Sequence, residues 1–206
     1  MSTYLLINLC SIAIPLIYSF HNRLQVYRTW YALWPAIVIT TSFFIVWDIY
    51  FTRWGVWGFN PKHLLGIDWL GLPVEEWLFF ICIPYACVFT YACLKRLLQK
   101  DYLGRFAEKM SWTFIVSLTA IGLWHLERLY TSTTFLATAA FLALHLLVFK
   151  SSYLGRFYFA YTILLLPFLI VNGLLTGTLI EEQVVWYNNA ENLGLRVLTI
   201  PVEAVV

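Results

Sequence analysis

Two glutamates at matching positions are the residues of this chain best placed to do chemistry. Each ends the same pattern, in which Asn is followed by five residues, Gly, six residues and then Pro-Val-Glu. The two copies comprise Asn60, Gly66, Pro73, Val74 and Glu75, and Asn188, Gly194, Pro201, Val202 and Glu203. Trp57 precedes the first copy and Trp186 precedes the second. An identical spacing in two copies indicates an internal repeat, and a carboxylate at each copy suggests one site built from two halves.

The spacing also suggests what these acids could do. Pro73 and Pro201 suit the first turn of a helix, which places Glu75 and Glu203 in that same turn. The positive helix end favours a charged carboxylate, whereas burial in an apolar environment favours the neutral acid. Because Glu75 and Glu76 cannot both ionise cheaply in a dry pocket, we expect one to stay protonated. Such a pair suits chemistry that donates a proton and then tolerates a cation. The alternative, that both acids only cap a helix at the water boundary, stays open.

Composition identifies the elements that must position these residues. Hydrophobic residues make up 61% of the chain, charged residues 12%, and the mean hydropathy is +0.75. A soluble domain would have about 25% charged residues, so the sequence predicts an all-α, multi-pass membrane helical bundle. The expected spans are Tyr4 to Phe20, Trp30 to Tyr50, Leu72 to Leu94, Trp112 to Leu126, Thr134 to Phe149 and Phe157 to Thr176. A seventh span is expected to begin near Leu195 and to be truncated at Val206.

The repeat divides these spans into two parallel groups of three joined by a connecting helix. We expect a first repeat at residues 1–94, a connecting segment and helix at 95–133, and a second repeat at 134–206. Nine of the 13 Lys and Arg residues fall in the connections after the first, third and fifth spans. Since basic loops stay in the cytoplasm, the chain is expected in the cytoplasmic (inner) membrane, with its N-terminus outside and both repeated loops on the outer side.

Further polar and aromatic residues surround the repeated acids. Asp48 and Asn172 lie near the ends of the spans that precede the two loops, and each has a threonine four residues later. An intramembrane Asp is a functional candidate by default, although a hydrogen bond to Arg53 would make Asp48 structural. Trp57 and Trp186 could stabilise a cation through their ring faces, while membership of an interfacial aromatic belt is the alternative.

Other classes of chemistry lack the residues they need. No G-x-G-x-x-G pattern supports a dinucleotide or flavin fold. The aspartates are too scattered to hold magnesium for a prenyl-diphosphate enzyme, and the four histidines are too few and scattered for a di-iron oxygenase. The net charge of +2 reflects membrane orientation and gives no reason to expect nucleic acid as a partner. No cofactor and no metal site are predicted.

The residues of both copies carry a resemblance to a known family. The stretch W-G-V-W-G-F-N through L-P-V-E-E-W-L-F-F, residues 54–80, and the stretch V-V-W-Y-N through T-I-P-V-E, residues 184–203, resemble the non-flavin lycopene cyclases. That family includes heterodimeric bacterial enzymes and their fused single-chain relatives, and the resemblance covers nearly the whole chain. Its acids correspond to Glu75, Glu76 and Glu203. The chain departs from the family pattern at Ala204, where a second acid would be expected.

The resemblance implies a membrane enzyme of carotenoid biosynthesis that folds the acyclic ends of lycopene into rings, as an intramolecular lyase or isomerase. β-Ionone rings, and so γ- and β-carotene, are the expected products. Acid and base groups in a dry aromatic pocket suffice for this redox-neutral reaction. We expect Glu75 or Glu76 to donate the proton, Glu203 to act as base or cation stabiliser, and Asn60 and Asn188 to organise the two loops.

Partners and competing functions complete the expectations. The expected partners are the lipophilic carotenoid substrate and membrane lipid, with a second copy of the chain or other carotenoid enzymes left open. A carotenoid- or lipid-binding membrane protein without catalysis is the main alternative, and it would not need paired acids. A transporter would show helices broken near the bilayer midplane.

Overall fold

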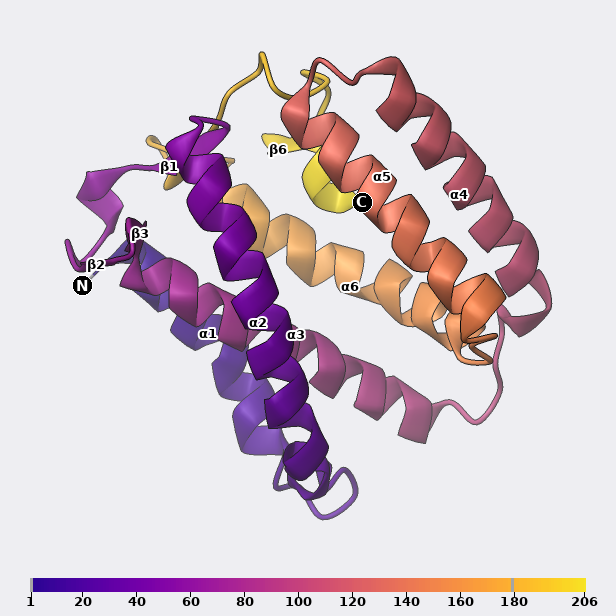
Figure 1. Cartoon of the computed structure of the whole chain (residues 1–206). Helices are drawn as coiled ribbons and strands as arrows, with labels where there is room; N and C mark the ends of the chain where they lie inside the picture. The colour runs from indigo at the N-terminus through magenta and orange to yellow at the C-terminus, as the bar shows by residue number, and fades with distance from the viewer. Residues whose placement is uncertain (1, 179) are drawn as a thin grey trace. The chain divides into compact units, whose positions relative to one another are not determined.

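The computed structural model describes residues 2–178 and 180–206, and these residues are mainly helical (Figure 1). The described residues form six α-helices: α1 (Thr3–Tyr18), α2 (Trp30–Arg53), α3 (Val74–Leu97), α4 (Ala107–Trp124), α5 (Leu129–Ala143) and α6 (Leu154–Leu175). A π-helical turn, Leu144–Val148, continues α5. The expected all-α membrane bundle is confirmed.

The strands are short and lie in the two repeated loops or next to them. They are β1 (Trp57–Phe59), β2 (Asp68–Trp69), β3 (Leu72–Pro73), β4 (Val185–Tyr187), β5 (Arg196–Val197) and β6 (Ile200–Pro201). Strands β2 and β3 form an antiparallel hairpin in which Asp68 pairs with Pro73, and β5 and β6 form one in which Arg196 pairs with Pro201. Leu70 and Leu198 adopt φ of 55° and 59°, a left-handed conformation that is uncommon for leucine. Both repeats therefore make the same turn.

Four helical segments of the described chain are long and apolar enough to cross a membrane. They are Val26–Arg53, Val74–Leu97, Leu129–Val148 and Leu154–Leu175. Helix α1 is apolar but has only 16 residues, and α4 is not among the four. The sequence predicted six complete spans, whereas four segments of the described chain meet the length and hydropathy that a membrane span needs. Helices α3 and α6 run without interruption through Pro84 and Pro167.

Several boundaries differ from those predicted by hydropathy; α4, for example, begins at Ala107 and not at Trp112, and two differences bear on the repeated loops. Helix α5 begins at Leu129, five residues before the predicted start at Thr134. The prediction was late because the first turn of this helix carries polar residues, which lower the average hydropathy. The hairpin β5–β6 occupies the predicted start of the seventh span, and a 3₁₀ turn at Val202–Val205 follows it. Val202 corresponds to Val74, the first residue of α3, so both repeats start a helix at the same position.

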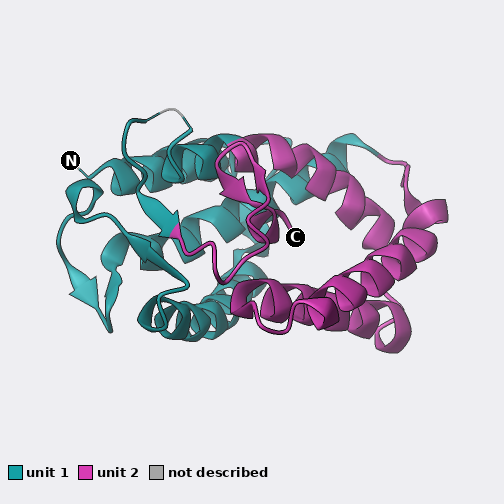
Figure 2. Cartoon of the chain, turned by 90° about the horizontal axis from the view of Figure 1, so that it is seen from above, with its two compact units in different colours: residues 1–98, 170–186 teal, residues 99–169, 187–206 magenta. Residues whose placement is uncertain are grey.

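The chain divides into two compact units (Figure 2). Unit 1 comprises residues 1–98 and 170–186, and unit 2 comprises residues 99–169 and 187–206. In unit 1, α1 and α2 both pack against α3. Its core includes Leu33, Ile37 and Tyr85, and the Tyr85 hydroxyl lies 2.6 Å from Ser19 Oγ. Burial of these apolar side chains fixes the three helices that carry the first loop.

Unit 2 is centred on the pairing of α4 with α5. Phe135 and Ala139 of α5 pack with Leu118 of α4, and Leu193 and Val202 of the second loop pack against this cluster. The second loop is therefore anchored to α5 by apolar contacts. Elsewhere in the unit, two copies of the sequence Tyr-Leu-Gly-Arg-Phe, residues 102–106 and 153–157, meet at their glycines. A Cβ atom on the second glycine would lie 2.5 Å from the first glycine's Cα, so the contact requires glycine.

Candidate functional site

Glu75 lies in the first turn of α3 and is completely buried. Its Oε1 atom accepts a hydrogen bond from Ser2 Oγ at 2.7 Å and another from the backbone amide of Leu65 at 2.6 Å. Its Oε2 atom is buried and has no hydrogen-bond partner among the described residues. One oxygen of this carboxyl group thus ties the first loop to the start of α1, while the other is left for a different purpose.

Glu203 has the same environment in unit 2. Its Oε1 atom accepts from Thr131 Oγ1 at 2.6 Å and from the backbone amide of Leu193 at 2.7 Å. Its Oε2 atom is likewise buried without a hydrogen-bond partner in the described part of the chain. Leu65 and Leu193 are separated by 128 residues, as Glu75 and Glu203 are. The repeat seen in the sequence is therefore also a repeat of hydrogen bonds.

Backbone contacts hold both loops in the same shape. The amide of Val74 donates to the carbonyl of Ile67 at 2.9 Å, and the equivalent amide of Val202 donates to Leu195 at 3.1 Å. These bonds satisfy one of the free amides at each helix start. The hairpin, the helix start and the buried carboxyl group consequently form one rigid assembly in each unit.

Glu76 belongs to a second polar cluster, which lies inside unit 1. The hydroxyl of Tyr4, on α1, donates a hydrogen bond to Glu76 Oε2. The carboxyl groups of Glu76 and Asp48, on α2, are direct neighbours that interact electrostatically. Trp57 Nε1 and Thr52 Oγ1 both donate to Asp48 Oδ1, and Asp48 Oδ2 is buried with no hydrogen-bond partner among the described residues. Three helices and strand β1 thus meet at this acid pair.

This arrangement changes the pairing suggested by the sequence. The carboxyl group that faces Glu76 is that of Asp48, on α2, and Glu75 is directed to its own partners, Ser2 and Leu65. Asp48 accepts hydrogen bonds from Trp57 and Thr52, and the bond to Arg53 that would have made it structural is not among its contacts.

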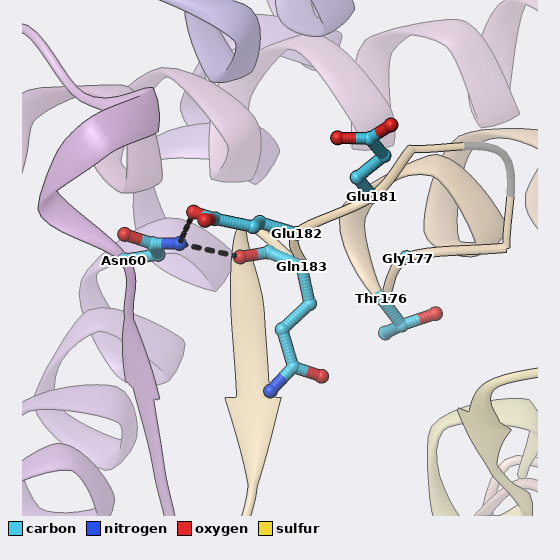
Figure 3. A pocket seen from close by; sticks show the side chains of 6 residues that line it. All are labelled: Asn60, Thr176, Gly177, Glu181, Glu182 and Gln183. Atoms are coloured by element: carbon cyan, nitrogen blue, oxygen red, sulfur yellow. Dashed lines mark hydrogen bonds between the residues drawn. The ribbon is translucent and has the colours of Figure 1, made fainter.

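Asn60 connects the first loop to residues that follow α6. Its Oδ1 atom caps the amide of Lys62 at 3.1 Å, and its Nδ2 atom donates to the carbonyl of Gln183 at 3.2 Å and to Glu182 Oε2 at 3.4 Å (Figure 3). Lys62 Nζ donates to Glu182 Oε1 at 2.7 Å, and this hydrogen bond holds the pKa of Glu182 below its ordinary value. These hydrogen bonds therefore hold the exposed edge of the first loop against residues 182 and 183.

A polar hollow of about 410 Å³ lies beside these hydrogen bonds. Asn60, Thr176, Gly177, Glu181, Glu182 and Gln183 line it (Figure 3). It is open, and its walls present carboxylate and amide groups. A hydrocarbon substrate would gain nothing by entering a hollow with such walls, because apolar groups gain free energy only by leaving polar surroundings. We therefore assign the hollow no part in binding a carotenoid.

The remaining predicted site residues have local packing roles. Trp186 covers Gly58, where a Cβ atom would lie 2.4 Å from the indole ring, so this contact requires glycine. Gly58 lies in β1, which pairs with β4. In unit 2, Asn188 Oδ1 accepts from the amide of Ala190 at 3.0 Å, as Asn60 does from Lys62. The two asparagines thus shape the same turn in each loop.

Sequence reasoning missed the partners on the first turns of α1 and α5. Ser2, Tyr4 and Asn8 are all buried, and Asn8 Nδ2 donates to the carbonyl of Glu75 at 2.7 Å. Tyr4 and Asn8 are four residues apart, so they share one helix face, and a polar side chain in an apolar span is a functional candidate. That signal was present in the sequence. Thr131 lies 129 residues after Ser2, one more than the repeat offset, so the repeat alone does not single it out.

Comparison with known proteins identifies relatives for both repeats. The family model described as lycopene cyclase matches residues 1–94 and 127–206, which is most of the chain. The chain is 25% identical over 158 residues to a bifunctional lycopene cyclase/phytoene synthase of Neurospora crassa, covering 72% of this chain and 25% of that protein. It is 31% identical over 99 residues to the protein of the same description from Pyrenophora tritici-repentis, covering 47% and 16% respectively.

The chain thus spans about a quarter or less of the length of these curated relatives. No solved structure matches it.

Proposed function

This chain belongs to the lycopene cyclase family, and on that premise we propose that it closes the acyclic ends of lycopene into rings within the membrane. The proposed rings are of the β-ionone type, giving γ- and β-carotene. The observation that carries the proposal is the pair of equivalent buried glutamates, Glu75 and Glu203, each with one oxygen held by the loop and one oxygen unpaired. Buried acids without basic partners are expensive to keep, so a function for them is expected.

The chemistry requires only proton transfers. A carboxylic acid gives its proton to the terminal double bond of lycopene, so an O–H bond breaks, a C–H bond forms and a tertiary cation results. The ring closes when a neighbouring double bond attacks the cation, and a carboxylate then removes a proton to form the ring double bond. One proton enters and one leaves, so no oxidant or reductant is consumed.

The proposed roles follow the positions of the acids. Glu75 and Glu76 are the candidate proton donors, and Glu203 is the candidate base or cation stabiliser. The rings of Trp57 and Phe51, whose centroids lie 4.9 Å apart, border the acid pair and offer faces that stabilise a cation. We place the protein in the cytoplasmic membrane with its N-terminus outside, and the substrate would reach it from the lipid.

The test supplies unlabelled lycopene in D₂O buffer to membranes that contain the full-length protein and analyses the pigments formed. Cyclisation in which an exchangeable acid protonates the alkene should give ring products that carry one solvent deuterium per ring. The Glu75→Gln/Glu76→Gln double variant, which keeps the shape of both side chains, should form few or no rings. Lycopene that is bound by the purified protein but recovered unchanged and unlabelled would instead indicate a carotenoid-binding protein without catalysis.

A further inference from the structure

The two repeats share one set of acid contacts but not the other. Glu75 and Glu203 each accept one hydroxyl and one loop amide on Oε1; the amide donors lie 128 residues apart, as the glutamates do, and the hydroxyl donors, Ser2 and Thr131, lie 129 apart. Both repeats possess this set of contacts, which joins the loop to the start of α1 in the first repeat and of α5 in the second, as contacts that hold a loop in place must do. The shared pattern therefore gives the Oε1 atoms of Glu75 and Glu203 a role in shaping the loops, and it leaves their Oε2 atoms available for chemistry.

The second cluster exists in the first repeat alone. The position equivalent to Glu76 is Ala204, and the position equivalent to Tyr4 is Ser132. The position before the second loop that corresponds to Asp48 is Asn172, whose side-chain amide cannot ionise or donate a proton as a carboxylic acid does. The second repeat therefore has no counterpart of the Asp48–Glu76 pair, and chemistry that needs these two acids belongs to the first repeat.

The hydrogen bonds within this cluster restrict where its proton can be. Two neighbouring carboxyl groups in an apolar interior cannot both be charged cheaply, so together they hold one proton. Asp48 Oδ1 already accepts from Trp57 and Thr52, and Glu76 Oε2 already accepts from Tyr4. The proton is therefore confined to the remaining two oxygens, Asp48 Oδ2 and Glu76 Oε1.

The number of hydrogen-bond donors separates the two acids. Both are buried, with Glu76 7% and Asp48 1% exposed. Asp48 is also enclosed by its two donors, whereas Tyr4 binds Glu76 from one side only. Because Glu76 accepts one hydrogen bond and Asp48 accepts two, we assign the transfer to substrate to Glu76, with Asp48 as the group behind it that can hold the proton.

We infer that the Asp48–Glu76 pair of the first repeat is the proton source for cyclisation, with Tyr4 as the positioning residue that fixes the Glu76 carboxyl group. This inference rests on the proposed function and assigns its first step. The proton leaves Glu76 for the less substituted carbon of lycopene's terminal double bond, and the pair is then doubly charged beside the new tertiary cation, which balances the added charge. A carboxylate then removes a ring proton and the pair takes up a proton from solvent, so each cycle brings one solvent proton in and sends one out.

The first measurement is independent of activity. Infrared spectra of the purified full-length protein in H₂O and D₂O should show the carbonyl stretch of a protonated carboxylic acid that shifts with the isotope. Asp48→Asn and Glu76→Gln should each remove one such component, because the two groups share one proton. Tyr4→Phe should keep the component but move it, since the hydrogen bond to Glu76 is lost. A spectrum that neither acid variant changes would overturn the inference.

The second measurement is cyclisation in the lycopene-accumulating host and in vesicles. Glu76→Gln and Asp48→Asn should lower kcat by roughly a hundredfold or more, as expected for loss of a general acid. Tyr4→Phe should lower kcat by roughly tenfold and leave KM unchanged, whereas Ser132→Ala, the matched control in the second repeat, should leave both unchanged. Equal losses for Tyr4→Phe and Ser132→Ala would refute a positioning role.

The two proposals fail in different ways. If the wild-type protein shows the shared-proton component but forms no rings, the cyclase proposal fails and the acid pair remains. If rings form and Glu76→Gln retains full kcat, the cyclase proposal stands and the assignment of the proton source is wrong.

Discussion

Replacing Glu75 by alanine should release the first loop, whereas replacing it by glutamine should not. The carboxyl Oε1 accepts two hydrogen bonds, from Ser2 and from the amide of Leu65. Hydrogen bonds to charged groups are worth about 1.5–3 kcal/mol each, and neutral ones about 1 kcal/mol. Alanine removes both bonds, so Glu75→Ala should cost roughly 2–6 kcal/mol. The lower half of that range applies if water can reach the Leu65 amide.

Glutamine keeps a carbonyl oxygen that can accept from both donors. Its amide nitrogen would take the place of Oε2, an atom with no hydrogen-bond partner among the described residues, so no bond is lost there. Glu75→Gln should therefore cost about 1 kcal/mol or less. If the proton source is the Asp48–Glu76 pair, this variant should also keep most of its cyclisation activity.

The assay is thermal unfolding of the purified full-length protein in detergent, together with limited proteolysis of the first loop. Glu75→Ala should lower the apparent Tm by several degrees more than Glu75→Gln and expose the loop to protease. The matched pair in the second repeat, Glu203→Ala and Glu203→Gln, should show the same difference, because Thr131 and Leu193 supply the same two donors. Equal stability of the alanine and glutamine variants would refute the role of Oε1 as a loop fastener.

Two further predictions concern the exposed edge of the first loop. Because the hydrogen bond from Lys62 lowers the pKa of Glu182, their contact should be present at neutral pH and lost as the pH falls through the lowered value. In Lys62→Ala, NMR titration should show the Glu182 pKa rising toward its ordinary value, and an unchanged titration would contradict the contact. Gly58→Ala would place a Cβ atom 2.4 Å from the Trp186 ring, so protease should cut the loop faster, and the double variant Gly58→Ala/Trp186→Ala should restore resistance if the clash is the cause.

The membrane helices and the repeat were accessible from the sequence because both are local properties. Apolar runs predict spans, and Gly66 and Gly194, with φ of 76° and 71°, mark the same left-handed turn in both loops. The start of α5 was misplaced by five residues for the converse reason. Thr131 and its neighbours are polar, so they lower hydropathy at the place where they approach Glu203.

The identity of the acids was likewise predictable, but not their partners. The sequence placed Glu75 beside Glu76 and suggested that these neighbours share a proton. In a helix, consecutive side chains point about 100° apart, so adjacent acids diverge, and Glu76 faces Asp48 of another helix. Tyr4 and Glu76 are separated by 72 residues, and no local pattern joins them.

Sequence alone thus indicated a membrane protein of repeated loops, each ending in a glutamate. Tertiary structure decided which carboxyl oxygen of Glu75 and Glu203 accepts the loop amide, and that Glu76 lies beside Asp48. The physical reason is that hydropathy and turn preferences depend on a residue's immediate neighbours. A hydrogen bond between helices depends instead on how the packing of α1 and α2 against α3 rotates each helix about its axis.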